Sequence, residues 1–128
     1  MKKQWDAVAD FMEAGGQIVG QEDWSFRERC SYQERVRSEC RETWDAIVMG
    51  DGVEIADGYA DIIYAAMTGL LNLAGREKAE RIFQAVVDAN TTKIDGSLGP
   101  VRRHENGKIL KPAGFVPPNQ KIKEILEG

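Results

Sequence analysis

All four prolines of this 128-residue chain lie between residues 100 and 118, and the first ninety residues contain none. Proline has no backbone N–H and its ring clashes with the preceding turn, so it ends or kinks helices. Its absence permits long helices up to residue 90, and its concentration afterwards predicts irregular structure. We therefore expect one all-α domain, with a helical bundle over residues 1–90 and a basic, Pro/Gly-rich tail over residues 91–128.

Apolar residues at helical spacing divide the first ninety residues into four expected helices. These are residues 3–13, 26–49, 53–73 and 77–90. Ser25 and Glu28 form a capping pattern before the second helix, and Gly50 and Gly75 mark the ends of the second and third. Because the connections are short, we expect antiparallel neighbours, as in a helical bundle.

The tail has its own signals. Asn106-Gly107 between short extended runs predicts a hairpin over residues 101–111, and residues 119–127 predict a short terminal helix. The tail carries seven Lys or Arg against four Asp or Glu, whereas the whole chain has a net charge of −4. The acidic body would repel a nucleic-acid backbone, so we expect no nucleic-acid partner.

Other features of the sequence bear on where in the cell the protein acts. No stretch is long and apolar enough to span a membrane, and the N-terminus has no apolar signal region. The two cysteines, Cys30 and Cys40, form no metal-binding or disulfide pattern. We expect a cytoplasmic protein.

Three acids, Glu54, Asp57 and Asp61, fall within a stripe of about 60° on the expected third helix. The rest of that helix is almost wholly apolar, and it has no Lys or Arg. Charged groups among residues that favour burial need a partner, and a divalent cation is a natural one for carboxylates. The alternative is the solvated face of an amphipathic helix.

Glu39 and Glu42 lie one turn apart on the second helix and flank its apolar stripe. If they face the third helix, four or five carboxylates converge, and such a group needs cations to stay ionised. Nearby arginines offer a simpler explanation by salt bridges; these are Arg35, Arg37 and Arg41. A di-iron bundle is excluded because the single histidine, His104, lies in the tail.

Four motifs occur in order along the chain: E-x-x-E at residues 39–42, D-x-x-x-D at 57–61, N-x-x-K at 90–93 and G-K-x-x-K-P-x-G-F at 107–115. Together they resemble the MazG-like all-α nucleoside triphosphate pyrophosphohydrolases, in particular the small members common in bacteria and phages. The resemblance covers about residues 11–118. The chain departs from the family at Ser38 and Gly58, where many relatives carry glutamate.

The resemblance implies hydrolysis of a (d)NTP to the monophosphate and pyrophosphate, which would control or reshape the dNTP pool, with dGTP or dUTP as substrates. It implies Mg²⁺ or Mn²⁺, two or more ions per site, and a homodimer or a dimer of dimers. Glu39, Glu42 and Asp61 would carry over as metal ligands, with Asp57 in the alternative D-x-x-x-D form and Glu54 added from the helical spacing. Glu39 or Glu42 would be the catalytic base. The triphosphate would be bound by Asn90, Lys93, Lys108 and Lys111.

Three alternatives stay open. The chain could be a phosphoribosyl-ATP pyrophosphohydrolase, a non-catalytic bundle that docks a partner through its acids, or an inactive nucleotide-binding member. The polar residues from Asn90 onward would then be a helix cap and solvated lysines. Four aromatic residues could stack on a base or pack in the core: Trp24, Phe26, Tyr32 and Trp44.

Overall fold

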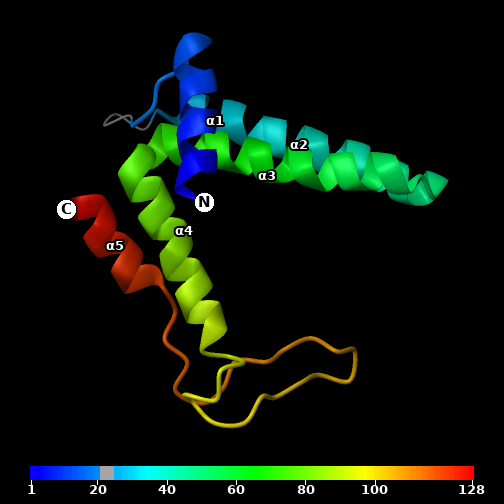
Figure 1. Ribbon diagram of the computed structural model, residues 1–128, viewed down its shortest axis with the longest axis vertical. Coiled ribbons are helices and arrows are strands. Elements are labelled where there is room, and N and C mark those ends of the chain that lie inside the picture. The colour runs from blue at the N-terminus through cyan, green and yellow to red at the C-terminus, as the bar shows by residue number, and fades with distance from the viewer. Residues whose placement is uncertain (21–24) are drawn as a thin grey trace. The chain divides into compact units, whose positions relative to one another are not determined.

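The computed structural model describes residues 1–20 and 25–128, and these residues are all-α, as the sequence predicted. They form the helices α1 (Lys2–Ala14), α2 (Phe26–Met49), α3 (Gly52–Ala74), α4 (Arg76–Thr91) and α5 (Asn119–Glu127), shown in Figure 1. Each begins and ends within about a residue of its expected bounds. No helix of the described ranges is long and apolar enough to cross a bilayer.

The chain divides into two compact units, Met1–Ala79 and Glu80–Gly128. The first contains α1, α2, α3 and the first turn of α4, and the second contains the rest of α4, the tail and α5. All the predicted metal ligands therefore belong to the first unit, and all the predicted phosphate-binding residues belong to the second.

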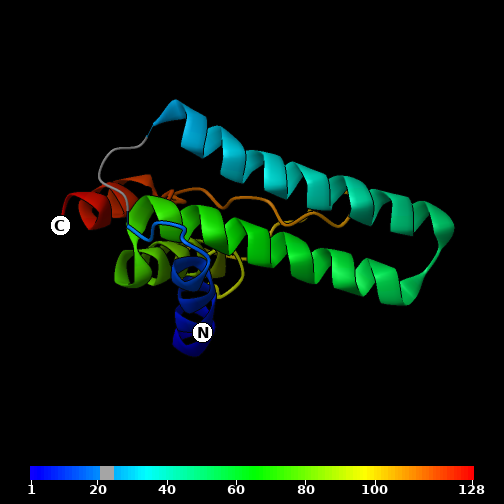
Figure 2. The same cartoon turned by 90° about the horizontal axis from the view of Figure 1, so that it is seen from above.

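The helices α2 and α3 run antiparallel, side by side, and form a long helical hairpin (Figure 2). The Ser25 hydroxyl accepts a hydrogen bond of 3.2 Å from the Glu28 N–H, as the capping pattern predicted. Gly50 ends α2 in the left-handed region at φ 70°. The Asp51 carboxylate then caps α3 by accepting from the N–H groups of Val53 and Glu54, at 3.1 and 3.2 Å.

Two glycines of α3 lie against α2. Gly58 is buried directly against Thr43, so closely that a β-carbon at residue 58 would collide with the threonine hydroxyl. Further along α3, Gly69 lies against Tyr32, where a β-carbon would make an ordinary van der Waals contact. At the base of the hairpin, Asn72 Nδ2 donates to Glu28 Oε1 at 3.1 Å. These contacts fix which residues of α2 face which residues of α3.

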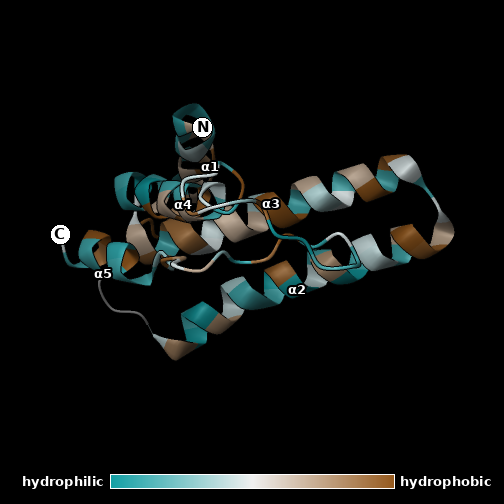
Figure 3. Cartoon of the chain, turned by 90° about the horizontal axis from the view of Figure 1, so that it is seen from below, coloured by the Kyte–Doolittle hydropathy of each residue, from teal (hydrophilic) through white to brown (hydrophobic). Residues whose placement is uncertain are grey.

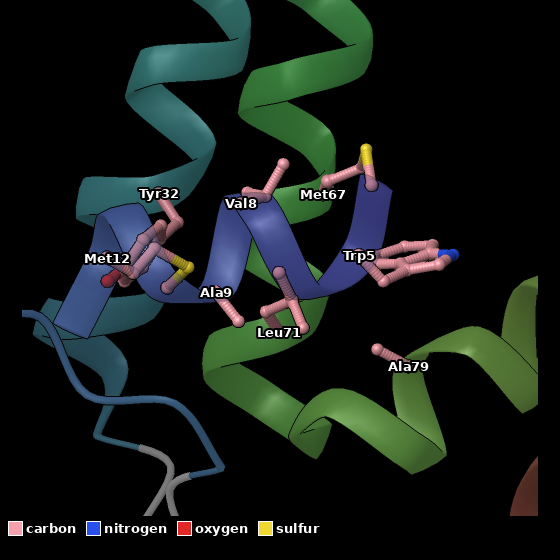
Figure 4. Packing of buried hydrophobic residues seen from close by; sticks show 8 residues of the cluster. All are labelled: Trp5, Val8, Ala9, Met12, Tyr32, Met67, Leu71 and Ala79. Carbon is pink, nitrogen blue, oxygen red and sulfur yellow. The ribbon is translucent and has the colours of Figure 1, made fainter. Parts of the chain in front are cut away.

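The core of the first unit lies where α1 crosses the base of the hairpin. The buried side chains that α1 contributes recur at helical spacing, as Figure 4 shows. The cluster comprises Trp5, Val8, Ala9 and Met12 from α1 with Tyr32, Met67, Leu71 and Ala79. The hairpin beyond this crossing therefore extends away from the core.

The second unit buries Ile82 of α4 and Ile125 of α5. Between these helices the chain makes the predicted reversal as a short tail hairpin: Arg103 and Ile109 form an antiparallel bridge, and the Leu110 N–H donates to the Arg102 carbonyl at 2.8 Å. Within the described residues this bridge is the only extended pairing, so the tail is irregular as expected.

Candidate functional site

Glu39 stands out among the carboxylates of the helical hairpin. It is half-buried on α2, and its Oε2 atom is shielded from solvent and accepts no hydrogen bond from any residue that the structure describes. Glu42 lies one turn further along the same helix and can accept a hydrogen bond from Glu39 when Glu39 is protonated. A buried carboxylate oxygen without a donor is unfavourable, so this position favours a proton or a cation.

The pKa of Glu39 is raised above its usual value, and burial is the largest cause. The hydrogen bond and negative charge of Glu42 raise it further, followed by the charges of Asp61 and Asp57 on α3. These four side chains, Glu39, Glu42, Asp57 and Asp61, form one electrostatic group across two helices. We call it the acidic cluster.

The close approach at Gly58 brings the two halves of the acidic cluster together. Thr43, which follows Glu42, donates from Oγ1 to the Glu39 carbonyl at 2.7 Å and is buried against Gly58. Gly58 itself follows Asp57 and precedes Asp61. Because glycine has no side chain, α3 can lie directly against Thr43 at this level. In the sequence Gly58 stands out only as a departure from the family pattern, and the signal for its role is a glycine inside an expected helix.

The fifth predicted ligand, Glu54, lies in the exposed first turn of α3, near the tip of the hairpin. The register that pairs Thr43 with Gly58 places Glu54 opposite Ile47, more than a turn beyond Glu42. Within the described chain, Glu54 is not among the carboxylates that raise the pKa of Glu39. Four of the five predicted acids therefore belong to one electrostatic group, and Glu54 lies outside it.

The arginines of α2 have other contacts. Arg37 and Arg41 each lie 3.6 Å from a carboxylate oxygen of Glu34, and Arg35 stacks on Tyr32 at 4.6 Å from the ring centre. Among the described residues, salt bridges with these arginines do not account for Glu39 and Glu42, which leaves the acids of the cluster facing one another.

The donor set of the acidic cluster is entirely carboxylate oxygen, which suits a hard divalent cation. A cation would also satisfy the shielded Glu39 Oε2 atom. Across residues 1–20 and 25–128, no three Asp, Glu, His or Cys side chains already stand as a metal-binding group.

The predicted phosphate-binding residues fall into two places in the second unit. Lys93 and Lys111 both contact the ring of Phe115, with Nζ atoms 5.2 and 5.5 Å from its centre. Asn90 lies beside Lys93 in a groove of α4 and donates from Nδ2 to the Val86 carbonyl at 3.1 Å. Lys108 is exposed in the tail hairpin.

The aromatic candidates lie in different environments. Tyr32 belongs to the buried core and donates from its hydroxyl to Gln17 Oε1 at 3.3 Å, so the core interpretation holds for it. Phe26 and Trp44 are exposed, at 78% and 63% of their surface. Trp24 lies outside the described residues.

No protein-family model matches this chain, and no curated protein matches it in sequence. The structure itself defines the chain as an all-α protein whose longest helices form a hairpin that carries an acidic cluster.

Proposed function

We propose that this protein is a metal-dependent nucleoside triphosphate pyrophosphohydrolase that converts a (d)NTP and water to the (d)NMP and pyrophosphate. The observation that carries the proposal is the Glu39 Oε2 atom, which is shielded from solvent and surrounded by the negative charges of Glu42, Asp57 and Asp61. The order of the E-x-x-E, D-x-x-x-D, N-x-x-K and K-P-x-G-F motifs supports this reaction over other uses of a cation.

Glu39, Glu42, Asp57 and Asp61 would hold Mg²⁺ or Mn²⁺, with Glu54 a further candidate toward the tip of the hairpin. When bound, the metal supplies Lewis-acid polarisation of the phosphoryl oxygens and a lower pKa for attacking water. The carboxylate of Glu39 or Glu42 that is not engaged with the metal accepts the proton of that water. A raised pKa suits Glu39 to this role, because a base works best when its pKa approaches the ambient pH.

In the reaction, the water oxygen bonds to the α-phosphorus and the bond from that phosphorus to the bridging oxygen of the β-phosphate breaks. Pyrophosphate leaves with the electron pair of that bond. Lys93, Lys108 and Lys111 would offset the negative charge of the triphosphate as point charges, and Asn90 would donate or accept a hydrogen bond.

The protein would act as a homodimer or a dimer of dimers. The part of the helical hairpin beyond the core exposes large apolar side chains, and Figure 3 shows apolar residues along both helices to the tip. They include Trp44, Val48, Met49, Val53, Tyr59 and Ile63. A second hairpin laid against these helices would cover part of this apolar surface.

The test is pyrophosphate release from each canonical NTP and dNTP, dUTP and phosphoribosyl-ATP, with Mg²⁺ or Mn²⁺. We expect Glu42→Gln to lower turnover of the preferred (d)NTP at least about 100-fold, since positioned acid–base groups contribute that much. The matched control is Glu34→Gln, which removes an acid from the same helix outside the cluster. Absence of turnover by the wild type, or equal loss in both variants, would refute the proposal. Preference for phosphoribosyl-ATP would select the alternative enzyme.

A further inference from the structure

Phe115 lies at a point where two segments of the second unit meet. Its ring contacts Lys93, from the turn after α4, and Lys111, from the end of the tail hairpin. Both Nζ atoms lie within 5.5 Å of the same ring centre, although the two lysines are 18 positions apart in the sequence. Neither the spacing of the lysines nor their charge alone would bring them together.

Hydrogen bonds to backbone carbonyls restrict the chain near Phe115 and near each lysine. The Phe115 N–H donates to the Pro112 carbonyl at 3.1 Å, closing a turn in which Gly114 has a φ of 85°. A type II turn requires a positive φ at that position, which glycine adopts without strain. The Lys93 N–H donates to the Asn90 carbonyl at 3.1 Å, and Arg102 Nη1 donates to the Lys111 carbonyl at 3.3 Å. These bonds restrict the backbone at Phe115, Lys93 and Lys111.

Two ammonium groups on one ring create a site that favours an anion. The face of an aromatic ring attracts cations, so Phe115 offsets part of the repulsion between the two lysines. What remains is two positive charges beside one ring, and the cation–π contacts restrict the lysine side chains. A polyphosphate carries several negative charges close together and would engage both lysines at once, with little further loss of side-chain freedom.

We propose that Phe115 is a positioning residue that holds Lys93 and Lys111 as one polyphosphate-binding pair. It acts through the lysines and need not touch the ligand. The identity of the anion rests on the proposed function, since a (d)NTP substrate and its pyrophosphate product are both polyphosphates. Lys108, which lies in the turn of the tail hairpin, is outside this pair.

The experiment titrates inorganic tripolyphosphate into the full chain by calorimetry, without divalent cations, so that the acidic cluster plays no part. We expect the wild type to bind, with affinity falling as salt rises. Phe115→Leu should weaken binding roughly fivefold, because it removes two cation–π contacts and the order they impose. Phe115→Tyr keeps a ring and should retain the wild-type affinity. The charge-matched control is Lys123→Ala, which removes an exposed lysine of α5 and should change the affinity little.

A double-mutant cycle separates positioning from general support of the fold. If Phe115 acts through the lysines, Lys93→Ala should cost much less affinity in the Phe115→Leu background than in the wild type. Additive losses, unchanged binding by Phe115→Leu, failure of Phe115→Tyr to retain affinity, or no binding by the wild type would each overturn the inference. Tripolyphosphate binding with this coupling but no pyrophosphate release from any nucleotide would support the inference and count against the proposed hydrolase.

Discussion

At the scale of single residues, Gly58 determines how closely α2 and α3 approach beside the acidic cluster. We expect Gly58→Ala to destabilise the chain by about 1–3 kcal/mol, because the new methyl group would collide with the buried, hydrogen-bonded Thr43. This outcome opposes the helix propensity, which favours alanine by about 1 kcal/mol. Urea unfolding followed by circular dichroism measures the change, and adding Thr43→Ala should recover part of it.

Gly69→Ala provides the control for this prediction. Gly69 lies in the same helix, and its nearest neighbour, Tyr32 Cβ, stands at an ordinary 3.6 Å from where a β-carbon would lie. This variant should be as stable as the wild type or more so. If Gly58→Ala and Gly69→Ala unfold at the same urea concentration, the close packing at Thr43 does not limit the fold.

Glu39 makes the stability of the chain depend on pH. Because its pKa is raised in the folded state, the folded chain keeps this proton to a higher pH than the unfolded chain does. Between the two pKa values the folded state binds more protons, so the free energy of unfolding falls as pH rises through that window. Glu39→Gln removes this effect. Without divalent cations, the variant should therefore gain stability over the wild type as pH rises through the raised pKa of Glu39.

Urea unfolding of both proteins at a series of pH values above and below the usual pKa of glutamate tests this expectation. Glu42, Asp57 and Asp61, the groups that face Glu39, are retained in both, and Glu34→Gln serves as the control at an exposed position. A difference between Glu39→Gln and wild type that does not vary with pH would contradict it. Added Mg²⁺ should stabilise the wild type more than the variant, because ligands stabilise the state that binds them.

The acids themselves could be chosen from sequence, because their helical spacing and the lack of nearby lysine or arginine on α3 were visible there. Their grouping depends on register, which helical spacing does not fix. The contact of Thr43 with Gly58 joins Glu39 and Glu42 to Asp57 and Asp61 and places Glu54 a turn away. The pairing of Lys93 with Lys111 on Phe115 likewise depends on tertiary contacts between distant segments.

At the scale of secondary structure elements, the sequence predicted the helices well because their ends carry strong local signals. Ser25, Gly50 and Gly75 lie at the expected boundaries, and local hydrogen bonds satisfy the helix ends. The crossing of α1 over the base of the hairpin had no such signal. The apolar stripe of α1 predicts that this helix packs against others, but it does not predict which part of the hairpin it contacts. The same holds for Arg76, whose role depends entirely on where α1 lies.

Arg76 holds α1 in place by contacts with three of its acids. Its guanidinium lies 3.3 Å from Asp6, 2.7 Å from Asp10 and 2.6 Å from Glu13, and these contacts raise its pKa. We expect Arg76→Ala to speed amide hydrogen exchange in α1 while leaving the middle of α2 and α3 unchanged, because three like charges would lose their counterion. The loss of stability should be small and should shrink at high salt, since the ion pairs of Arg76 are partly exposed.

Arg76→Lys is the informative comparison, because lysine keeps the charge but cannot form the forked contacts of a guanidinium. It should fall between wild type and Arg76→Ala. If Arg76→Ala leaves exchange in α1 unchanged, the apolar core alone fixes that helix.

At the scale of the whole molecule, the distribution of exposed apolar surface predicts self-association. Trp44, Val53 and Ile63 are 63%, 78% and 58% exposed on the helical hairpin, away from the core that α1 covers. Within the part of the chain that the structure describes, these side chains have little cover. Monomeric proteins rarely expose large contiguous apolar patches, so we expect a dimer or tetramer by analytical ultracentrifugation at micromolar concentration.

Ile63→Glu should shift this equilibrium toward the monomer, because burying an unpaired carboxylate at the centre of the contact is strongly unfavourable. Ser31→Glu adds the same charge at an exposed position of α2 near the base of the hairpin and should leave the assembly intact. If the second copy also encloses the acidic cluster, Ile63→Glu should lose pyrophosphate release together with assembly, although all the carboxylates remain. A monomeric wild type, or a monomeric Ile63→Glu variant with full activity, would show that one hairpin suffices for the chemistry.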